Sequence, residues 1–261
     1  WMGGARGVWG ALAMLALAGA GCAEPAEVTA AGERPEAIRL DVFGPAGPVS
    51  PDPEDAAAWI YDQDSFHTFD IELADAALAF LDEDPTAEEY VPGRFLFDGV
   101  DHGPVGIRYK GSVGAWLGCV SDMGMSFPMG FGGSRTCPKL NLKVSFDWGN
   151  PGGRFHGLKK LVFHAMNNDA SLMRERLGYW LYREMGAPAP RAVHARVRIN
   201  GKLAGVFLNV EYIDGRFTRN HFPDGEGNLY KEVWPTGNEM TGMPTRESMA
   251  GGLRTNEDEA P

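Results

Sequence analysis

An alternation of apolar and polar positions predicts a series of short β-strands through the middle of this 261-residue chain. In the segment HTFDIEL, residues 67–73, the side chains of Phe69, Ile71 and Leu73 fall on one face of an extended strand. Further strands are predicted at residues 94–98, 105–110, 139–146, 158–164, 193–199, 203–210 and 229–233. Asn200-Gly201, between two of these strands, is a strong signal for a tight hairpin turn.

Two segments have helical spacing instead. Residues 74–82 predict a short helix after the first strand, and residues 171–185 predict a longer one that Asp169 or Ser171 caps and Gly186 ends. The longer helix has an apolar stripe, which consists of Met173, Leu177, Trp180, Leu181 and Met185. Because antiparallel strands precede and follow this helix, the pattern predicts an α+β fold, an antiparallel sheet with one long packed helix.

The first 22 residues have the three-part layout of an export signal. Arg6 precedes an apolar run at residues 8–18, and small residues then lead to Cys22. The apolar run is shorter than the roughly 20 residues that a transmembrane helix requires. Because the small residues before Cys22 resemble a bacterial lipobox, we expect a lipid on this cysteine that holds an exported protein at the membrane of the cell envelope. Signal cleavage without acylation is the alternative.

Composition defines the rest of the layout. Residues 23–58 are rich in Ala, Pro, Glu and Gly, which is typical of a flexible tether, so the folded domain is predicted at residues 59–261. The formal net charge of -11 at pH 7 argues against nucleic acid as a partner, because phosphate backbones require a basic surface. The six histidines lack metal-ligand spacing, and no metal site is predicted.

The cysteines fit an exported protein. If Cys22 carries a lipid, Cys119 and Cys137 remain, and export permits a disulfide between them. The segment between these two residues is part of a long stretch, residues 111–137, that is rich in Gly and has no periodicity. Two unpaired cysteines are the alternative.

Four segments in order resemble the CotH family of spore-coat-type atypical protein kinases. They are VGIRYKGS at residues 105–112, the strand that follows Pro138, the segments FHGLKKL, NND and SLMR between residues 155 and 188, and VRINGKLAGVFLNVEYID followed by GNLYK at residues 197–231. The resemblance covers roughly residues 65–235. It implies a kinase-like fold, ATP with Mg²⁺ or Mn²⁺ as cofactor, and phosphate transfer to Ser or Thr of an exported protein.

The resemblance also implies which residues contact the nucleotide. Lys139 falls where the family has its ATP-contacting lysine, and Gly111 with Ser112 would let backbone N–H groups approach phosphate. Lys231, in the GNLYK segment, is a further candidate. The alternatives are a solvated strand lysine at position 139 and an ordinary turn at Gly111.

Two acidic residues complete the implied set. Glu175, in the long helix, is the candidate ion-pair partner of Lys139, and Glu211 ends a strand where the family has an acidic residue near adenine. A solvated helix face and a strand-terminal glutamate without such a role are the alternatives.

The sequence departs from the family in two places. Ser112 stands where the family usually has Asn, and a Gly- and Met-rich insertion precedes Lys139. Nothing before Pro261 matches the family's catalytic Asp- and Asn-containing segments, so no catalytic residue is assigned. We therefore expect an N-terminal portion of a longer kinase domain that is not a competent kinase alone. A non-catalytic envelope or coat protein that binds a partner is the competing hypothesis.

Overall fold

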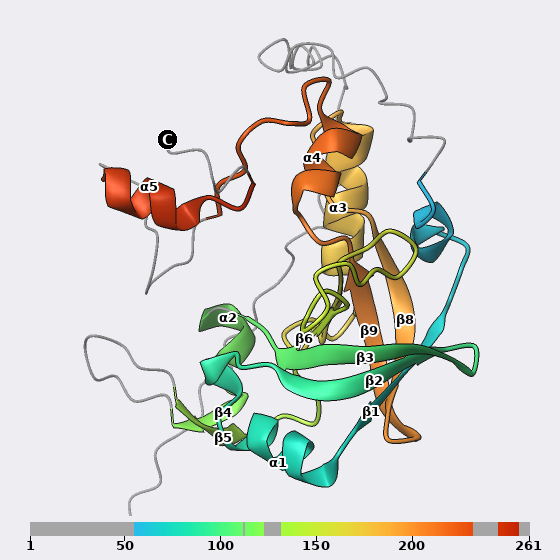
Figure 1. Ribbon diagram of the computed structural model, residues 1–261, viewed down its shortest axis with the longest axis vertical. Helices are drawn as coiled ribbons and strands as arrows, with labels where there is room; N and C mark the ends of the chain where they lie inside the picture. The colour runs from blue at the N-terminus through green and yellow to red at the C-terminus, as the bar shows by residue number, and fades with distance from the viewer. Residues whose placement is uncertain (1–54, 112, 123–131, 232–244, 256–261) are drawn as a thin grey trace, which may run out of the picture. The chain divides into compact units, whose positions relative to one another are not determined.

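Most strands of the domain form one sheet that closes into a barrel. The computed structural model describes residues 55–111, 113–122, 132–231 and 245–255 (Figure 1). Around the barrel the strands follow the order β1 (Thr68–Leu73), β2 (Val91–Phe97), β3 (Val100–Tyr109), β6 (Leu142–Ser145), β7 (Lys160–His164), β9 (Lys202–Val210) and β8 (Ala192–Ile199). Neighbours are antiparallel except β1 and β8, whose parallel pairing closes the sheet. The predicted mixed fold with a mostly antiparallel sheet is confirmed.

The barrel interior is filled by the apolar faces that the alternating pattern predicts. Phe69, Phe95 and Phe163 are fully buried, and the ring centroid of Phe69 lies 5.8 Å from that of Phe95 and 5.3 Å from that of Phe163. Phe155, from the loop between β6 and β7, stacks on Phe146 at 5.3 Å. Because the apolar faces point inward, the polar side chains of the same strands point to the outside.

Both tight hairpins depend on residues with left-handed backbone conformation. Asn200 and Gly201 have φ values of 51° and 74° between β8 and β9, as the sequence predicts. Asp98 and Gly99 have φ values of 50° and 76° between β2 and β3. The second turn is tighter than the predicted strands at residues 94–98 and 105–110 imply. Residues 100–103 instead belong to β3.

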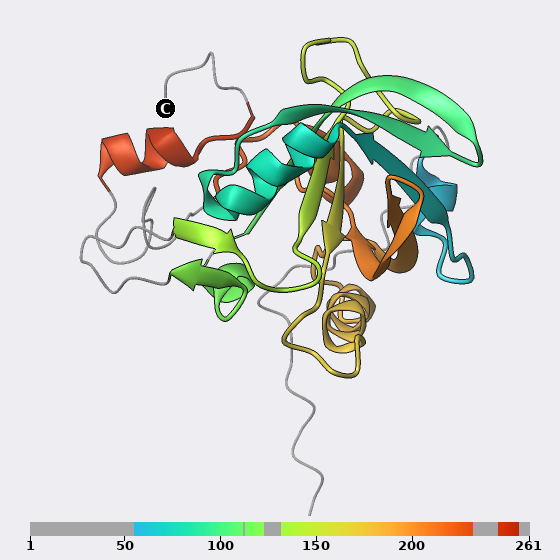
Figure 2. The same ribbon diagram turned by 90° about the horizontal axis from the view of Figure 1, so that it is seen from below.

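Short helices flank the barrel. They are η1 (Ala58–Tyr61), α1 (Asp75–Glu83), η2 (Pro85–Ala87), α2 (Val113–Trp116), α4 (Gly215–His221) and α5 (Arg246–Gly252). A separate two-stranded sheet, β4 (Val120–Asp122) with β5 (Gly132–Arg135), lies beside α1 (Figure 2). The stretch predicted to lack structure at residues 111–137 thus contains a helix and two strands. A disulfide joins Cys119 to Cys137 across this sheet.

The longest helix, α3 (Arg174–Glu184), begins later than the sequence predicts. Leu172 has a φ of 56°, which a right-handed helix cannot contain. The carboxylate of Asp169 accepts hydrogen bonds from the Ser171 backbone N–H at 3.0 Å and from the Arg174 backbone N–H at 2.8 Å. Asp169 therefore holds the helix start in place from outside it.

The apolar stripe of α3 is not packed against the sheet, and this prediction was wrong. No residue of α3 is buried, and Leu177, Trp180 and Leu181 are 51%, 47% and 52% exposed. The helix contacts the barrel through polar side chains and through Tyr179, which packs against Leu208 and Val210 on β9. Glu175 bonds to His164 on β7, and Arg176 bonds to His194 on β8.

The folded domain begins before residue 59, which corrects the predicted end of the tether. Ala57 is fully buried in the core, and the Asp55 side chain is 2% exposed. The Asp55 carboxylate pairs with Arg191 at 2.6 Å and also with Arg216. Ion pairs, which composition does not reveal, fix this segment. Residues 1–54, with the predicted signal, Cys22 and most of the tether, lie outside the described residues.

The C-terminal part differs from the prediction of a final strand at residues 229–233. Tyr230 forms an isolated bridge with Leu253, and the Lys231 backbone N–H donates to the Gly252 carbonyl at 2.8 Å. Residues 232 and 233 lie outside the described residues. In the part of the chain that the structure describes, no helix is both long enough and apolar enough to cross a membrane.

Replacement of Asp55 tests the corrected domain boundary. Asp55→Asn should lower the free energy of unfolding by about 3 kcal/mol, because it removes the charge that two largely buried guanidinium groups share. The control Asp64→Asn, at an exposed position, should change it by less than about 0.5 kcal/mol. Denaturant unfolding at pH 7 measures both. Equal free energies of unfolding for the two variants would contradict this boundary and assign Asp55 to the tether.

Candidate functional site

A cavity of about 790 Å³ lies on the outer face of the barrel, against β3, β6 and β7. Its walls include the end of β9, the Tyr212-Ile213 segment that follows and two residues from the C-terminal part. We call it the first cavity. Five of its lining residues are basic, namely Arg108, Lys110, Lys143, Lys231 and Arg254.

Strand register brings the first cations together. Arg108 on β3 pairs with Lys143 on β6, so both side chains project from the same side of the sheet. Their neighbours Tyr109 and Leu142, which also pair, point into the core and are buried. In the strand predicted at residues 139–146, the side chain of Lys143 therefore lies on the floor of the first cavity.

Lys143 is a cation with little water around it. The residue is 8% exposed, and its Nζ lies 3.3 Å from the Tyr212 hydroxyl and 4.6 Å from the centroid of the Tyr212 ring. Burial lowers the pKa of Lys143 to about 7, with repulsion from Arg108, Lys160 and Lys231 adding to the effect. The ordinary pKa of lysine is about 10.4. The ammonium form of Lys143 is thus poorly compensated in the free protein.

Lys231 shares the same aromatic ring. Its Nζ lies 4.1 Å from the centroid of the Tyr212 ring, and the Nζ of Lys160 lies 5.3 Å from it. Burial lowers the pKa of Lys231 to about 8; Asp214 opposes this, and Lys110 and Arg254 reinforce it. Three ammonium groups therefore lie near the Tyr212 ring. Cation–π attraction favours this arrangement, whereas repulsion among the three charges opposes it.

A chain of hydrogen bonds connects Lys110 to α3. The Lys110 Nζ lies 3.1 Å from His164 Nε2, and His164 Nδ1 lies 2.6 Å from the Glu175 carboxylate. The Tyr179 hydroxyl donates to the same carboxylate at 3.0 Å. Burial alone would raise the pKa of Glu175, but the hydrogen bond with His164 and the charge of Lys110 lower it. Burial also lowers the pKa of Lys110.

Glu211, at the end of the β9 hairpin, anchors one wall. It is 3% exposed, and Arg191 contacts both of its carboxylate oxygens, at 2.6 and 3.1 Å. Burial would raise the pKa of Glu211, but hydrogen bonds with His221 and Arg191 outweigh it and lower the pKa to about 2. Glu211 is therefore an ionised structural partner of Arg191.

Glu88 also lines the first cavity. Its carboxylate pairs with Arg108 and accepts the Gly111 backbone N–H at 2.7 Å. A Cβ at Gly111 would lie 2.4 Å from the Ala115 Cβ, so no larger residue fits there without movement. The close turn after β3 thus depends on a glycine at this position.

Of the residues implied by the resemblance, Gly111, Glu211 and Lys231 line the first cavity. Glu175 lines a smaller adjoining cavity of about 290 Å³. Ser112 lies outside the described residues.

Lys139 does not line the first cavity, and its expected ion pair with Glu175 is absent from the described part of the chain. The Lys139 Nζ donates to the Val206 carbonyl at 2.6 Å and lies 5.1 Å from the centroid of the Phe207 ring. Lys139 precedes the start of β6, and its stem runs along Gly205 on β9. Lys143, four residues further on, takes the place in the cavity that Lys139 was expected to hold.

The family model described as CotH kinase protein matches residues 107–260, more than half of the chain. The chain belongs to the CotH family. The match runs from β3 to the C-terminal part and so contains all five cations of the first cavity, whereas Glu88 and Asp55 precede it.

Two curated relatives of this CotH chain come from Bacillus subtilis (strain 168). It is 37% identical over 70 residues to an inner spore coat protein H-like protein, an alignment that covers 27% of this chain and 20% of the relative. It is 38% identical over 60 residues to inner spore coat protein H, covering 23% of this chain and 17% of the relative. The aligned segments span a fifth or less of the lengths of these relatives.

Only one of the five cavity cations of this CotH chain, Lys231, was predicted from the sequence. The alternating pattern did place Lys143 on the same strand face as Lys139, and that was the available signal. Lys110, Arg108 and Arg254 had none, because their convergence depends on strand pairing and on the fold of the C-terminal part.

Protonation of the buried lysines should make stability depend on pH. Folded Lys143 and Lys231, with pKa values of about 7 and 8, bind fewer protons than the unfolded chain at higher pH. The free energy of unfolding should therefore rise between pH 7 and 9. Lys143→Met should add about 1–3 kcal/mol at pH 6 and flatten the rise, because it removes a buried charge.

Lys202→Met, at an exposed position at the start of β9, is the matched control and should leave the pH profile unchanged. Chemical denaturation at several pH values in dilute, phosphate-free buffer measures all three proteins. A free energy of unfolding that falls from pH 7 to 9 would contradict the assignment of Lys143 as a buried cation.

Proposed function

We propose that this chain binds the polyphosphate of ATP in the first cavity, as the nucleotide-holding part of a CotH-type kinase with a kinase-like fold that phosphorylates Ser or Thr of exported proteins. The observation that carries the proposal is the group of Lys110, Lys143 and Lys231. All three have lowered pKa values in a chain of net charge -11. A bound polyanion relieves the repulsion among such cations and restores their protonated state.

The residues that line the first cavity fit a nucleoside triphosphate. The cavity volume of about 790 Å³ falls within the range of small-molecule sites, about 300–1,000 Å³. The cations come from strands and from ordered segments, so they are fixed before a ligand arrives, which phosphate transfer requires. When bound, ATP supplies the phosphoryl group that is transferred. The Lys and Arg side chains bind and orient its phosphates.

Lys110 receives additional positioning from α3. The bonds from Lys110 to His164 and from His164 to Glu175 hold the ammonium group at the edge of the cavity. Glu175 thus acts through His164 rather than through Lys139, and its proposed role is that of a positioning residue.

Glu88 and Glu211, which also line the first cavity, are engaged by Arg108 and Arg191. Among the described residues, no group of three or more His, Cys, Asp or Glu side chains could hold a metal ion. The five cations support assigning the first cavity to phosphate binding, and we name no catalytic base or Mg²⁺ ligand.

A second candidate function is partner binding without catalysis, in a spore coat or cell envelope. The exposed apolar stripe of α3 favours it, because exposed apolar faces of this kind mark interaction sites. The names of the two relatives, both inner spore coat proteins, support the same location outside the cytoplasm.

Nucleotide titration separates the two functions. ATP with Mg²⁺ or Mn²⁺ should raise the melting temperature, and Lys143→Ala should weaken ATP binding by about tenfold or more, because a charged hydrogen-bond donor is lost. Lys139→Ala should leave ATP affinity within about twofold of the parent, since the Lys139 ammonium is held by Val206. Calorimetry at pH 7 gives the affinities. No stabilisation by ATP with either metal would favour the non-catalytic function.

Affinity should also depend on pH. The polyphosphate should bind more weakly as pH rises from 7 to 9, because Lys143 and Lys231 lose their protons over this interval. Tripolyphosphate titrations of the parent and of Lys143→Ala compare the slopes, and the variant should lose part of the dependence. The same slope in both proteins would exclude Lys143 from the phosphate contacts.

A further inference from the structure

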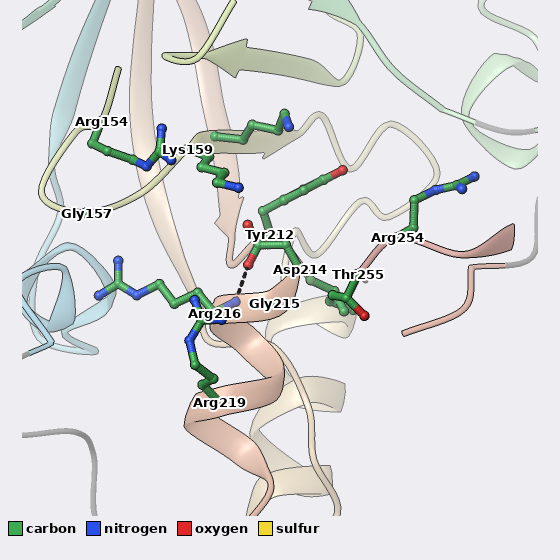
Figure 3. A pocket seen from close by; sticks show the side chains of 12 residues that line it. Arg154, Gly157, Lys159, Tyr212, Asp214, Gly215, Arg216, Arg219, Arg254 and Thr255 are labelled. Carbon is green, nitrogen blue, oxygen red and sulfur yellow. Dashed lines mark hydrogen bonds between the residues drawn. The ribbon is translucent and has the colours of Figure 1, made fainter. Parts of the chain in front are cut away.

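A second cavity, of about 630 Å³, lies on the other side of the segment that follows β9 (Figure 3). Its lining includes six basic residues, namely Arg154, Lys159, Lys160, Arg216, Arg219 and Arg254. They come from the loop before β7 and the first residue of β7, from α4 and from the segment after α5, so three separate parts of the chain place positive charge around one cavity.

Little negative charge is present to neutralise this lining. Among the described residues Asp214 is the only carboxylate in the wall, and its Oδ1 accepts the backbone N–H groups of Arg216 and Phe217 at the start of α4. Three of the cations have carboxylate partners outside the cavity: Arg216 pairs with Asp55, Lys160 pairs with Asp147 at 3.5 Å, and Arg219 pairs with Glu226 at 3.9 Å.

Three other cations have no carboxylate partner among the described residues. The guanidinium groups of Arg154 and Arg254 donate to backbone carbonyls, and the Lys159 side chain is exposed. The positive potential of the second cavity is therefore available to a ligand. Because the chain as a whole is acidic, this concentration of charge stands out from the rest of its surface.

The second cavity adjoins the first. Tyr212, Ile213 and Arg254 line both, so a ligand group in one lies a short distance from a ligand group in the other. The exposed positions of Arg154 and Lys159 suit an extended ligand that lies across the surface. In the described part of this wall Tyr212 is the only aromatic side chain, and a single ring does not stack a run of nucleic-acid bases.

We propose that the second cavity binds an acidic segment of the protein substrate, a peptide with clustered Asp, Glu or phosphoserine residues. This rests on the proposed function, since the adjoining first cavity would then hold the ATP that phosphorylates a hydroxyl of the same substrate. The cations of the second cavity would select substrates by charge, as complementary potentials do at other interfaces.

Peptide titration tests this assignment. The probe is a fluorescent twelve-residue peptide of Asp, Glu and one Ser, measured by anisotropy against the full chain at low ionic strength. The double variant Arg154→Ala/Lys159→Ala should bind this peptide about tenfold more weakly than the parent, because two unpaired cations are lost. Lys202→Ala, another exposed lysine, should bind it as the parent does. Circular dichroism checks that the variants remain folded, and Lys159→Glu provides a second variant.

Three competitors decide the chemistry of the ligand. A phosphoserine version of the peptide should bind at least as tightly as the carboxylate version. Tripolyphosphate should displace the peptide only at a large excess, and displacement at equal concentration would make the second cavity a small-anion site. A single-stranded oligonucleotide that binds more tightly than the peptide, and that Arg154→Ala/Lys159→Ala weakens, would also overturn the proposal.

Parallel ATP titrations keep the two proposals separate. Arg154→Ala/Lys159→Ala should retain the ATP-induced rise in melting temperature, whereas Lys143→Ala should lose ATP binding and retain the peptide. Peptide binding that Lys143→Ala abolishes and that Arg154→Ala/Lys159→Ala leaves unchanged would place the peptide in the first cavity and refute this inference. Peptide binding in a parent that does not bind ATP would refute the proposed function and leave the peptide site standing.

Discussion

The buried ion network around Arg191 is the constraint on which both cavities depend. Arg191 contacts both oxygens of Glu211 and also pairs with Asp55, which in turn pairs with Arg216. These contacts join the start of the described domain, the end of β9 and the first turn of α4. Breaking such a network leaves a buried charge without its partner, which is energetically costly, so the network holds its residues in place. The Tyr212 to Asp214 segment, which separates the two cavities, is held between two of its members.

A second theme is the uneven use of charge. The chain has an excess of acidic residues, yet its lysines and arginines gather on both sides of Tyr212 without an equal number of carboxylates. In the free protein this grouping opposes folding, as the lowered pKa values of Lys143 and Lys231 express. Sites that bind anions commonly accept such a cost, because the same repulsion becomes attraction once a ligand enters.

Local patterns predicted much of the barrel and little of the site. The alternation of apolar residues located β1, β7, β8 and β9, and Asn200-Gly201 located a turn, because these features depend on neighbours in sequence. The parallel contact of β1 with β8 left no local signal, since its partners are far apart in the chain. The start of the domain at Asp55 was hidden by a Pro- and Ala-rich composition. The helix α3 shows a further limit, because helical periodicity reveals an apolar face but not what covers it. The family resemblance selected Lys139, which precedes β6 and does not line the first cavity, whereas the pairing of β6 with β3 shows that Lys143 does.

The parallel closure of the sheet has a consequence for the order of events during folding. Strand β1 leaves the ribosome early, but its partner β8 and the hairpin that supports β8 end more than a hundred residues later. Contacts over such separations form slowly, because the entropy of a long stretch of chain must be lost before the strands can form hydrogen bonds. The ring therefore cannot be completed before β8 and β9 have emerged. The barrel therefore stays open on the ribosome until its seventh strand along the chain has been made.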